Sequence, residues 1–177
     1  MKTTFAAATF IMTFAVGALA QGPQMPKPGP EHQRLHYYVG EWKSEGAMKP
    51  SAYGPGGTST VINHNRMLGD FFLVLESEGT GPMGPVKEVA VIGYDSNRKT
   101  YTFDQFSTRG QHGTATATVS GDTWTWLIPE VDMGGKKVKG RFTIKEVSPT
   151  EYTYKYDTSV DGGAWTNALE GKATKTK

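Results

Sequence analysis

Four polar residues in succession, Asn63 to Arg66, interrupt the stretch VINHNRM, which otherwise has the character of a β-strand. Side chains alternate between the two faces of a strand, so the two asparagines share one face while His64 and Arg66 share the other. If His64 and Arg66 face an interior, they could bind a carboxylate or phosphate, since a guanidinium offers two parallel donors. In the alternative, His64 and Arg66 face water, and Val61 and Met67 pack inside with the asparagines.

The other histidines offer two further chemistries. His112 lies in the segment TRGQHG close to Arg109, where a loop histidine could bind or gate a ligand. His32 and His36 are spaced i, i+4, a geometry that chelates metals on a helix. Gln33, however, stands where the metalloprotease pattern requires a glutamate. We therefore expect the pair on a solvated helix face and predict no metal site.

Residues for hydrolytic catalysis are scarce. The chain has no cysteine and no G-x-S-x-G motif. Glu76 and Glu78 share one strand face and could form a carboxylate pair for acid–base chemistry, but a solvated strand end explains them better. Asp104 and Gln105 pose the same ambiguity on another strand. We predict no catalytic residue, and we keep Gln105 as a group that could orient a ligand.

Aromatic residues recur at every second position in two segments. Trp124 and Trp126 form one row, and Tyr154 is the centre of another that runs from Tyr152 to Tyr156. Such rows pack a β core, and in a barrel with spare interior volume the same rings wall a pocket. The residues expected to bind a ligand are His64, Arg66, Gln105, Trp124, Trp126, Tyr154 and His112.

The N-terminal segment reads as an export signal. Lys2 precedes an apolar run from Phe5 to Leu19, and the A-x-A pattern at residues 18–20 predicts cleavage after Ala20 and a periplasmic or secreted chain. Four prolines in residues 21–30 predict an extended tether over 21–29. A net charge of +2 without a basic cluster argues against nucleic-acid binding, and no stable membrane insertion is expected after cleavage.

The remaining residues, 30–177, have the pattern of one all-β domain. Pro30 suits the first turn of a helix and Gly40 its end, which predicts a short helix over about Glu31 to Val39. From Glu41 onward the period changes to two and turn signals recur. The pattern predicts ten strands: Glu41–Met48, Thr58–Met67, Asp70–Glu78, Lys87–Tyr94, Lys99–Ser107, Gly113–Ser120, Thr123–Ile128, Lys137–Val147, Glu151–Ser159 and Trp165–Thr174.

The connections between these strands alternate in length. Tight links follow the second, fourth, sixth and eighth strands, whereas longer Gly- and Pro-rich links follow the first, third, fifth and seventh. In an up-and-down meander all links of one kind fall at the same end. The sequence therefore predicts a single up-and-down antiparallel barrel of about ten strands, closed at one end by the short N-terminal helix and carrying adaptable loops at the other.

Gly40-Glu41-Trp42, after a short helix and at the start of the first strand, resembles the G-x-W signature of lipocalins and their calycin relatives. The segments PEHQRLHYYVGEW, MLGDFFLVLESEG and VIGYDSNRKTY are more closely similar to a bacterial group in that superfamily, the domain-of-unknown-function family fifteen seventy-nine. The resemblance spans Pro30 to Thr174 and implies a calycin-like barrel. It implies a closed end built from Leu35, Val39, Gly40, Trp42 and a basic residue on the last strand, for which Lys172 is the candidate.

The resemblance also bears on cofactors and function. Some calycin barrels hold haem through a histidine on a late strand, and no histidine follows His112, so we expect no cofactor. The function expected is that of a carrier or sensor for a small apolar or planar ligand. A cofactor-free isomerase or cyclase using the same cavity, and a structural envelope protein with a filled barrel, are the alternatives. The chain is expected to be a monomer or homodimer.

Overall fold

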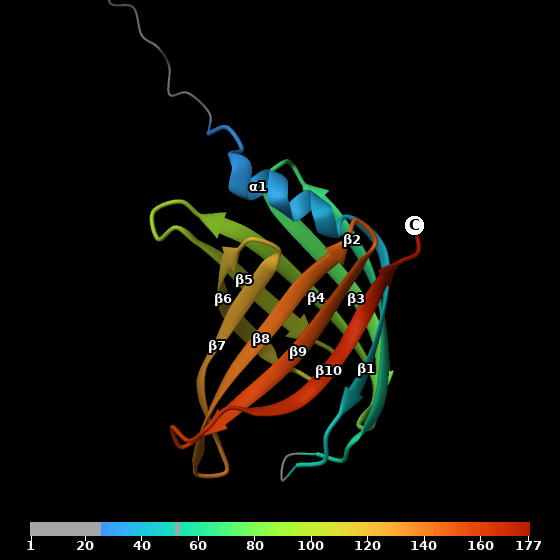
Figure 1. Cartoon of the computed structure of the whole chain (residues 1–177), viewed down its shortest axis with the longest axis vertical. Coiled ribbons are helices and arrows are strands. Elements are labelled where there is room, and N and C mark those ends of the chain that lie inside the picture. Colours follow the sequence, from blue (N-terminus) through green and yellow to red (C-terminus); the bar gives the residue numbers. More distant parts are fainter. Residues whose placement is uncertain (1–25, 52–53) are drawn as a thin grey trace, which may run out of the picture.

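Ten antiparallel strands form a closed barrel in the computed structural model, which describes residues 26–51 and 54–177 (Figure 1). A helix α1 (Pro30–Arg34) runs into a 3-10 helix η1 (Leu35–Tyr38) before the first strand. The strands are β1 (Gly40–Met48), β2 (Gly57–Leu68), β3 (Phe72–Gly81), β4 (Gly84–Asp95), β5 (Thr100–Ser107), β6 (His112–Ser120), β7 (Thr123–Met133), β8 (Lys136–Ser148), β9 (Glu151–Val160) and β10 (Thr166–Lys175).

Each strand pairs with its neighbours in the chain, and β1 also pairs with β10 to close the sheet. Closure satisfies the backbone groups that an open sheet would leave at its two edges. The fold predicted from the sequence, an all-β up-and-down barrel of about ten strands, is confirmed. The predicted export signal and most of the tether lie outside the described residues.

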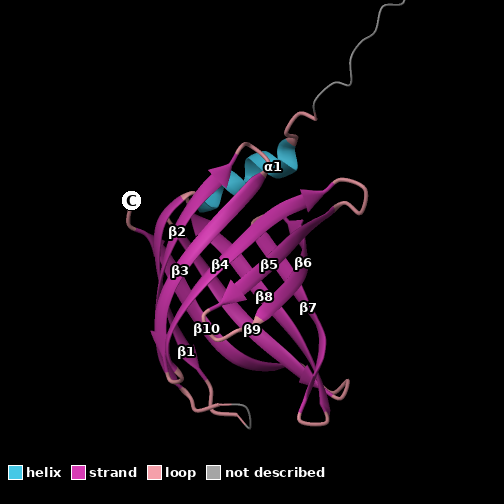
Figure 2. Cartoon of the chain, turned by 180° about the vertical axis from the view of Figure 1, so that it is seen from behind, coloured by secondary structure: helices cyan, strands magenta, loops and turns pink. Residues whose placement is uncertain are grey.

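The two short helical segments cover one end of the barrel, as two opposite views show (Figures 1 and 2). Pro30 begins α1, and Leu35 and Tyr38 are buried against the barrel interior. Gly40 then adopts a φ of 113°, which lets the chain turn from the helix into β1 where an L side chain would be strained. No helix among the described residues is long and apolar enough to cross a membrane.

Aromatic packing fills the closed end. Trp42 is fully buried, and its indole nitrogen donates a hydrogen bond of 2.9 Å to the carbonyl oxygen of Tyr38. Its ring lies 5.0 Å from that of Tyr152, and the rings of Tyr101 and Trp124 are 4.6 Å apart. Leu35, Val39, Gly40 and Trp42, the residues expected at this end, lie where the helical segment meets β1.

A charged group completes the seal around Trp124. Its indole nitrogen donates to a carboxylate oxygen of Glu146 at 2.7 Å, and Arg34 lies 3.4 Å from the same carboxylate. The Arg34 guanidinium also stands over the Trp124 ring, 5.7 Å from its centroid. The helix is thus joined to β7 and β8 by a side-chain network as well as by apolar burial.

The basic residue near Trp42 is Lys175, and the expectation for Lys172 was wrong. The Lys175 ammonium lies 5.6 Å from the Trp42 ring centroid, and the two residues are paired in register across β1 and β10. Ala173 and Lys175 share the inner face of β10. Side chains alternate along a strand, so Lys172 points outward.

Two of the expected long connections are tight turns. The β3–β4 link is only Pro82–Met83 and the β7–β8 link only Gly134–Gly135, because the paired strands continue further than their composition suggests. Hydrogen bonds between antiparallel strands join backbone groups and do not depend on the side chains. The Gly- and Pro-containing segments can therefore continue the pairing of β3 with β4 and of β7 with β8. Gly134 and Gly135 both have positive φ, as a two-residue type I′ hairpin requires.

Trp42→Ala should lower the free energy of unfolding by about 3–5 kcal/mol, since it removes a fully buried indole and its hydrogen bond. Urea denaturation followed by circular dichroism measures the change. Leu127→Ala is the matched control because Leu127 is 52% exposed on the barrel's outside, and it should change stability by less than about 1 kcal/mol. Equal losses in the two variants would contradict the role given to Trp42.

Candidate functional site

The barrel encloses a cavity of about 470 Å³ beyond the aromatic closed end. This volume is in the range of small-molecule sites. Small inward side chains leave the space, notably Ala90, Ala115 and Ser77. The lining residues are Ser44, Ser59, Val61, Asn63, Leu75, Ser77, Glu88, Ala90, Ile92, Phe103, Gln105, Ala115, Trp126, Ile128, Phe142, Ile144, Tyr152, Tyr154, Tyr156 and Leu169.

One side of the cavity is aromatic. Trp126 meets Phe103 with ring centroids 5.8 Å apart, and Phe142 stacks on Tyr154 at 5.5 Å. The ring of Tyr156 lies directly over Gly140, where a Cβ would come within 2.6 Å of its hydroxyl. A glycine at this position lets the tyrosine lie flat against the sheet. Strands β5, β7, β8 and β9 thus provide a wall of aromatic rings.

The opposite side carries a chain of hydrogen bonds. Ser77 Oγ donates to Asn63 Oδ1 at 2.7 Å, and Asn63 Nδ2 donates to Ser44 Oγ at 3.4 Å. Ser44 is in turn hydrogen-bonded to the hydroxyl of Tyr152. Burial raises the pKa of Tyr152 to about 12, so this hydroxyl keeps its proton at physiological pH. The polar groups therefore run in a continuous band over β3, β2 and β1 and reach Tyr152 on β9.

Glu88 extends this band on β4. It is paired in register with Ser77, is partly buried, and accepts a hydrogen bond from Gln105 on β5. Burial raises the pKa of Glu88, while Gln105 and the more distant guanidinium of Arg109 act in the opposite direction. The cavity thus places a carboxyl group of altered acidity among polar neighbours, facing a wall of aromatic rings.

The structure places His64 and Arg66 outside this cavity. His64 lies 3.4 Å from Glu41 and Arg66 lies 3.5 Å from Glu76, with both basic side chains more than half exposed. The inward orientation offered for the pair was therefore wrong, and the alternative with Asn63 inside was right. The physical reason is alternation: once Trp42 faces inward on β1, its register partner Asn63 on β2 must do the same.

The other expected ligand residues divide between the cavity, the closed end and the outside. Gln105, Trp126 and Tyr154 line the cavity. Trp124 is fully buried in the closed end and lines none of the cavity. His112 is on the outer surface, where its ring stacks on Phe106 at 4.6 Å.

Sequence reasoning missed the polar residues of the cavity, above all Glu88 and Ser77. A signal for Glu88 was present: it alternates with Ala90 and Ile92, so all three share a face of one strand. Nothing in the sequence states that this face is the inner one.

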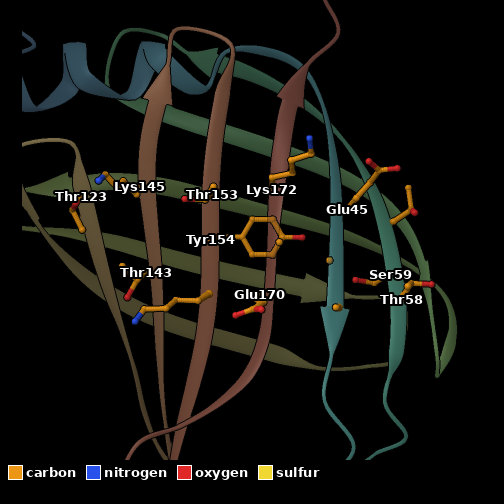
Figure 3. A pocket seen from close by; sticks show the side chains of 15 residues that line it. Glu45, Thr58, Ser59, Thr123, Thr143, Lys145, Thr153, Tyr154, Glu170 and Lys172 are labelled. Carbon is orange, nitrogen blue, oxygen red and sulfur yellow. The ribbon is translucent and has the colours of Figure 1, made fainter.

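A second hollow lies on the outer face of the barrel, over β7 to β10, β1 and β2 (Figure 3). Threonines and three lysines line it, Lys145, Lys155 and Lys172. Tyr154 lines both hollows, because Gly46 and Gly171 leave room for its ring between β9, β10 and β1. The outer hollow is the more open of the two, and the inner cavity has the mixed apolar and polar lining expected of a small-molecule site.

Comparison with known proteins identifies the family. Residues 27–175 match the family described as "Protein of unknown function (DUF1579)". The chain belongs to this family. No match was found among curated proteins.

Solved structures agree with the barrel fold. Rv2717c from M. tuberculosis superposes with a TM-score of 0.60 at 15% sequence identity, over 85% of this chain and 100% of that one. The S-type phycobiliprotein lyase CPES from Guillardia theta gives a TM-score of 0.51 at 13% identity, over 83% of this chain and 93% of that one. At these identities the likeness extends to the fold.

Glu88→Gln should leave the protein at least as stable as the wild type at neutral pH. Because burial raises the pKa of Glu88, the folded chain holds its proton more firmly than the unfolded chain, and its ionised form is unfavourable in the folded state. The stability advantage of the variant should therefore be greatest above the folded pKa and disappear below the ordinary pKa of 4.5. Thermal denaturation across this pH range measures it.

Glu78→Gln is the control for this experiment. Glu78 lies outside the barrel and pairs with Lys87 at 2.6 Å, which lowers its pKa. The control should give no gain in stability at neutral pH. A Glu88→Gln variant that melts well below the wild type at neutral pH would contradict the unfavourable burial of the carboxylate.

Proposed function

We propose that the chain binds a small, largely apolar, planar molecule inside the barrel and acts as a non-enzymatic carrier or sensor. The observation that supports this most directly is the two-sided lining of the 470 Å³ cavity, with aromatic rings facing a hydrogen-bonded polar band. Burial against the rings would supply affinity, and the polar band would fix the ligand's orientation.

A cofactor-free isomerase or cyclase is the second candidate. Glu88 is the observation that favours it, because a partly buried carboxyl whose pKa is raised by burial can exchange a proton with a substrate bound in the cavity. The third hypothesis, a structural protein whose barrel is filled by side chains, fits less well with a cavity of this size.

Binding of N-phenyl-1-naphthylamine tests the proposed function. This neutral, apolar, aromatic probe fluoresces strongly only in apolar surroundings, so the protein should enhance its emission in a saturable titration. Ala115→Phe should weaken binding at least roughly tenfold, because Ala115 lines the cavity and is 7% exposed. Thr116→Phe, at the next position and facing outward, should bind the probe like the wild type.

Folding of each variant is checked by circular dichroism before the titration. If Ala115→Phe does not fold, Ser77→Phe introduces the same ring from the polar side of the cavity. No saturable binding by the wild type, or equal binding by the inward and outward phenylalanine variants, would overturn an interior site.

We also propose that the chain is exported and cleaved after Ala20, on the strength of the apolar run and the A-x-A pattern at residues 18–20. Mass spectrometry of the protein from the periplasmic and extracellular fractions should find Gln21 as the first residue. Replacing Ala18 and Ala20 together by a bulky residue should block cleavage. Uncleaved, full-length protein confined to the cytoplasm of wild-type cells would contradict export.

A further inference from the structure

The cavity lining carries one carboxyl group and no basic side chain. Among its described lining residues, Glu88 is the carboxylic acid, and lysine, arginine and histidine are absent. The basic residue that acts on Glu88, at longer range, is Arg109, whose guanidinium donates to the carbonyl oxygens of Met83, Gly84 and Pro85 at the β3–β4 turn. The charge that a ligand meets inside the cavity is thus negative.

The surroundings of Glu88 leave room for a donor from a ligand. Gln105 on β5 satisfies part of the carboxylate, and Ser77 on β3 gives its own proton to Asn63. Lys87, which precedes Glu88 on β4, points outward, and its ammonium nitrogen lies 2.6 Å from a carboxylate oxygen of Glu78. No side chain of opposite charge therefore reaches Glu88 from the strands beside it, and burial disfavours its ionised form.

The wall that faces the polar band suits the same kind of ligand. Tyr154, Phe142 and Trp126 present electron-rich ring faces, which attract organic cations as well as apolar groups. Together with a carboxylate that has no ion-pair partner in the lining, these rings are complementary to a ligand that carries a positive charge on an apolar body. The same cavity would repel a carboxylate or phosphate ligand, because the lining has no cation to offset a second negative charge beside Glu88.

We propose that the cavity selects an organic amine, a monocation whose ammonium group binds between Glu88 and the amide oxygen of Gln105 while its apolar body lies against the aromatic wall. This inference rests on the proposed function and adds the chemical class of its ligand. It also gives a reason for a carboxyl group at an inward position of β4: its unfavourable ionisation in the empty cavity is relieved when a cation binds.

Three ligands of nearly equal size separate charge from shape. 1-Naphthylmethylamine is a cation at neutral pH, 1-ethylnaphthalene is its neutral isostere, and 1-naphthoic acid is an anion. Each is titrated against the protein carrying N-phenyl-1-naphthylamine, and displacement is followed by fluorescence. The amine should displace the probe at a concentration at least roughly tenfold lower than the neutral compound, and the anion should be the weakest competitor.

Glu88→Gln should abolish the order of these affinities. The amide keeps the size of the side chain and removes its charge. The affinity for the amine should therefore fall to that for the neutral compound, and the affinity for the anion should rise. Glu76→Gln is the matched control, since Glu76 lies outside the barrel on β3 beside Arg66. It should retain the wild-type preference for the amine.

The pH dependence gives a second readout. The wild type's affinity for the amine should decrease as the pH falls through the pKa of Glu88, whereas its affinity for 1-ethylnaphthalene should stay constant. The groups that face Glu88 are Gln105, Ser77 and, at longer range, Arg109, and the side chains of Gln105 and Ser77 carry no charge. The Glu88→Gln variant should show no pH dependence for either compound.

The outcomes distinguish this inference from the function on which it rests. If the probe binds and the amine competes no better than the neutral isostere, the cavity binds ligands but amine selection is wrong. A preference for the amine that survives in Glu88→Gln would also overturn the role given to Glu88. If neither the probe nor any of the three compounds binds, the proposed function itself fails.

Discussion

The ladder between β1 and β10 is the constraint on which the rest of the structure depends. Seven residue pairs, from Trp42 with Lys175 to Met48 with Leu169, join the first and last strands of the domain. Closure gives the sheet an inside and an outside, and alternation then assigns every other residue of each strand to the interior. It also fixes the place of the helix, because the chain enters β1 directly from η1 at the end where Trp42 is buried.

The interior so defined has a packed end and a hollow end. At the helix end, the large side chains of Tyr38, Trp42 and Trp124 are buried and pack together. Further along, alanines and serines stand on the inner face opposite the aromatic wall, and the barrel is hollow. Rigid packing at one end can hold the walls of the other in place, so that polar groups such as Ser77 and Glu88 are preorganised without being part of the closed core.

Much of this architecture was visible in the sequence. The count of strands, the short helix with Gly40 and Trp42 behind it, and the aromatic rows of β7 and β9 all follow from local periodicity, which needs only neighbouring residues. Local periodicity did not show which face of the VINHNRM strand points into the barrel. Both faces of that strand carry polar groups, so its sequence gives no preference for either face. For the same reason Lys172 was expected beside Trp42, where the structure has Lys175.

The sequence by itself therefore determined which segments are strands and that they form a meander with one closed end, although it gave long links in place of the tight β3–β4 and β7–β8 turns. Only the tertiary structure decided which side chains meet inside. Register across the closed sheet carries the inward face from Trp42 to Asn63, Ser77 and Glu88 in turn, and none of these pairings is encoded within a single strand. A cavity is made by residues far apart in the chain, so its chemistry appears only when the sheet closes.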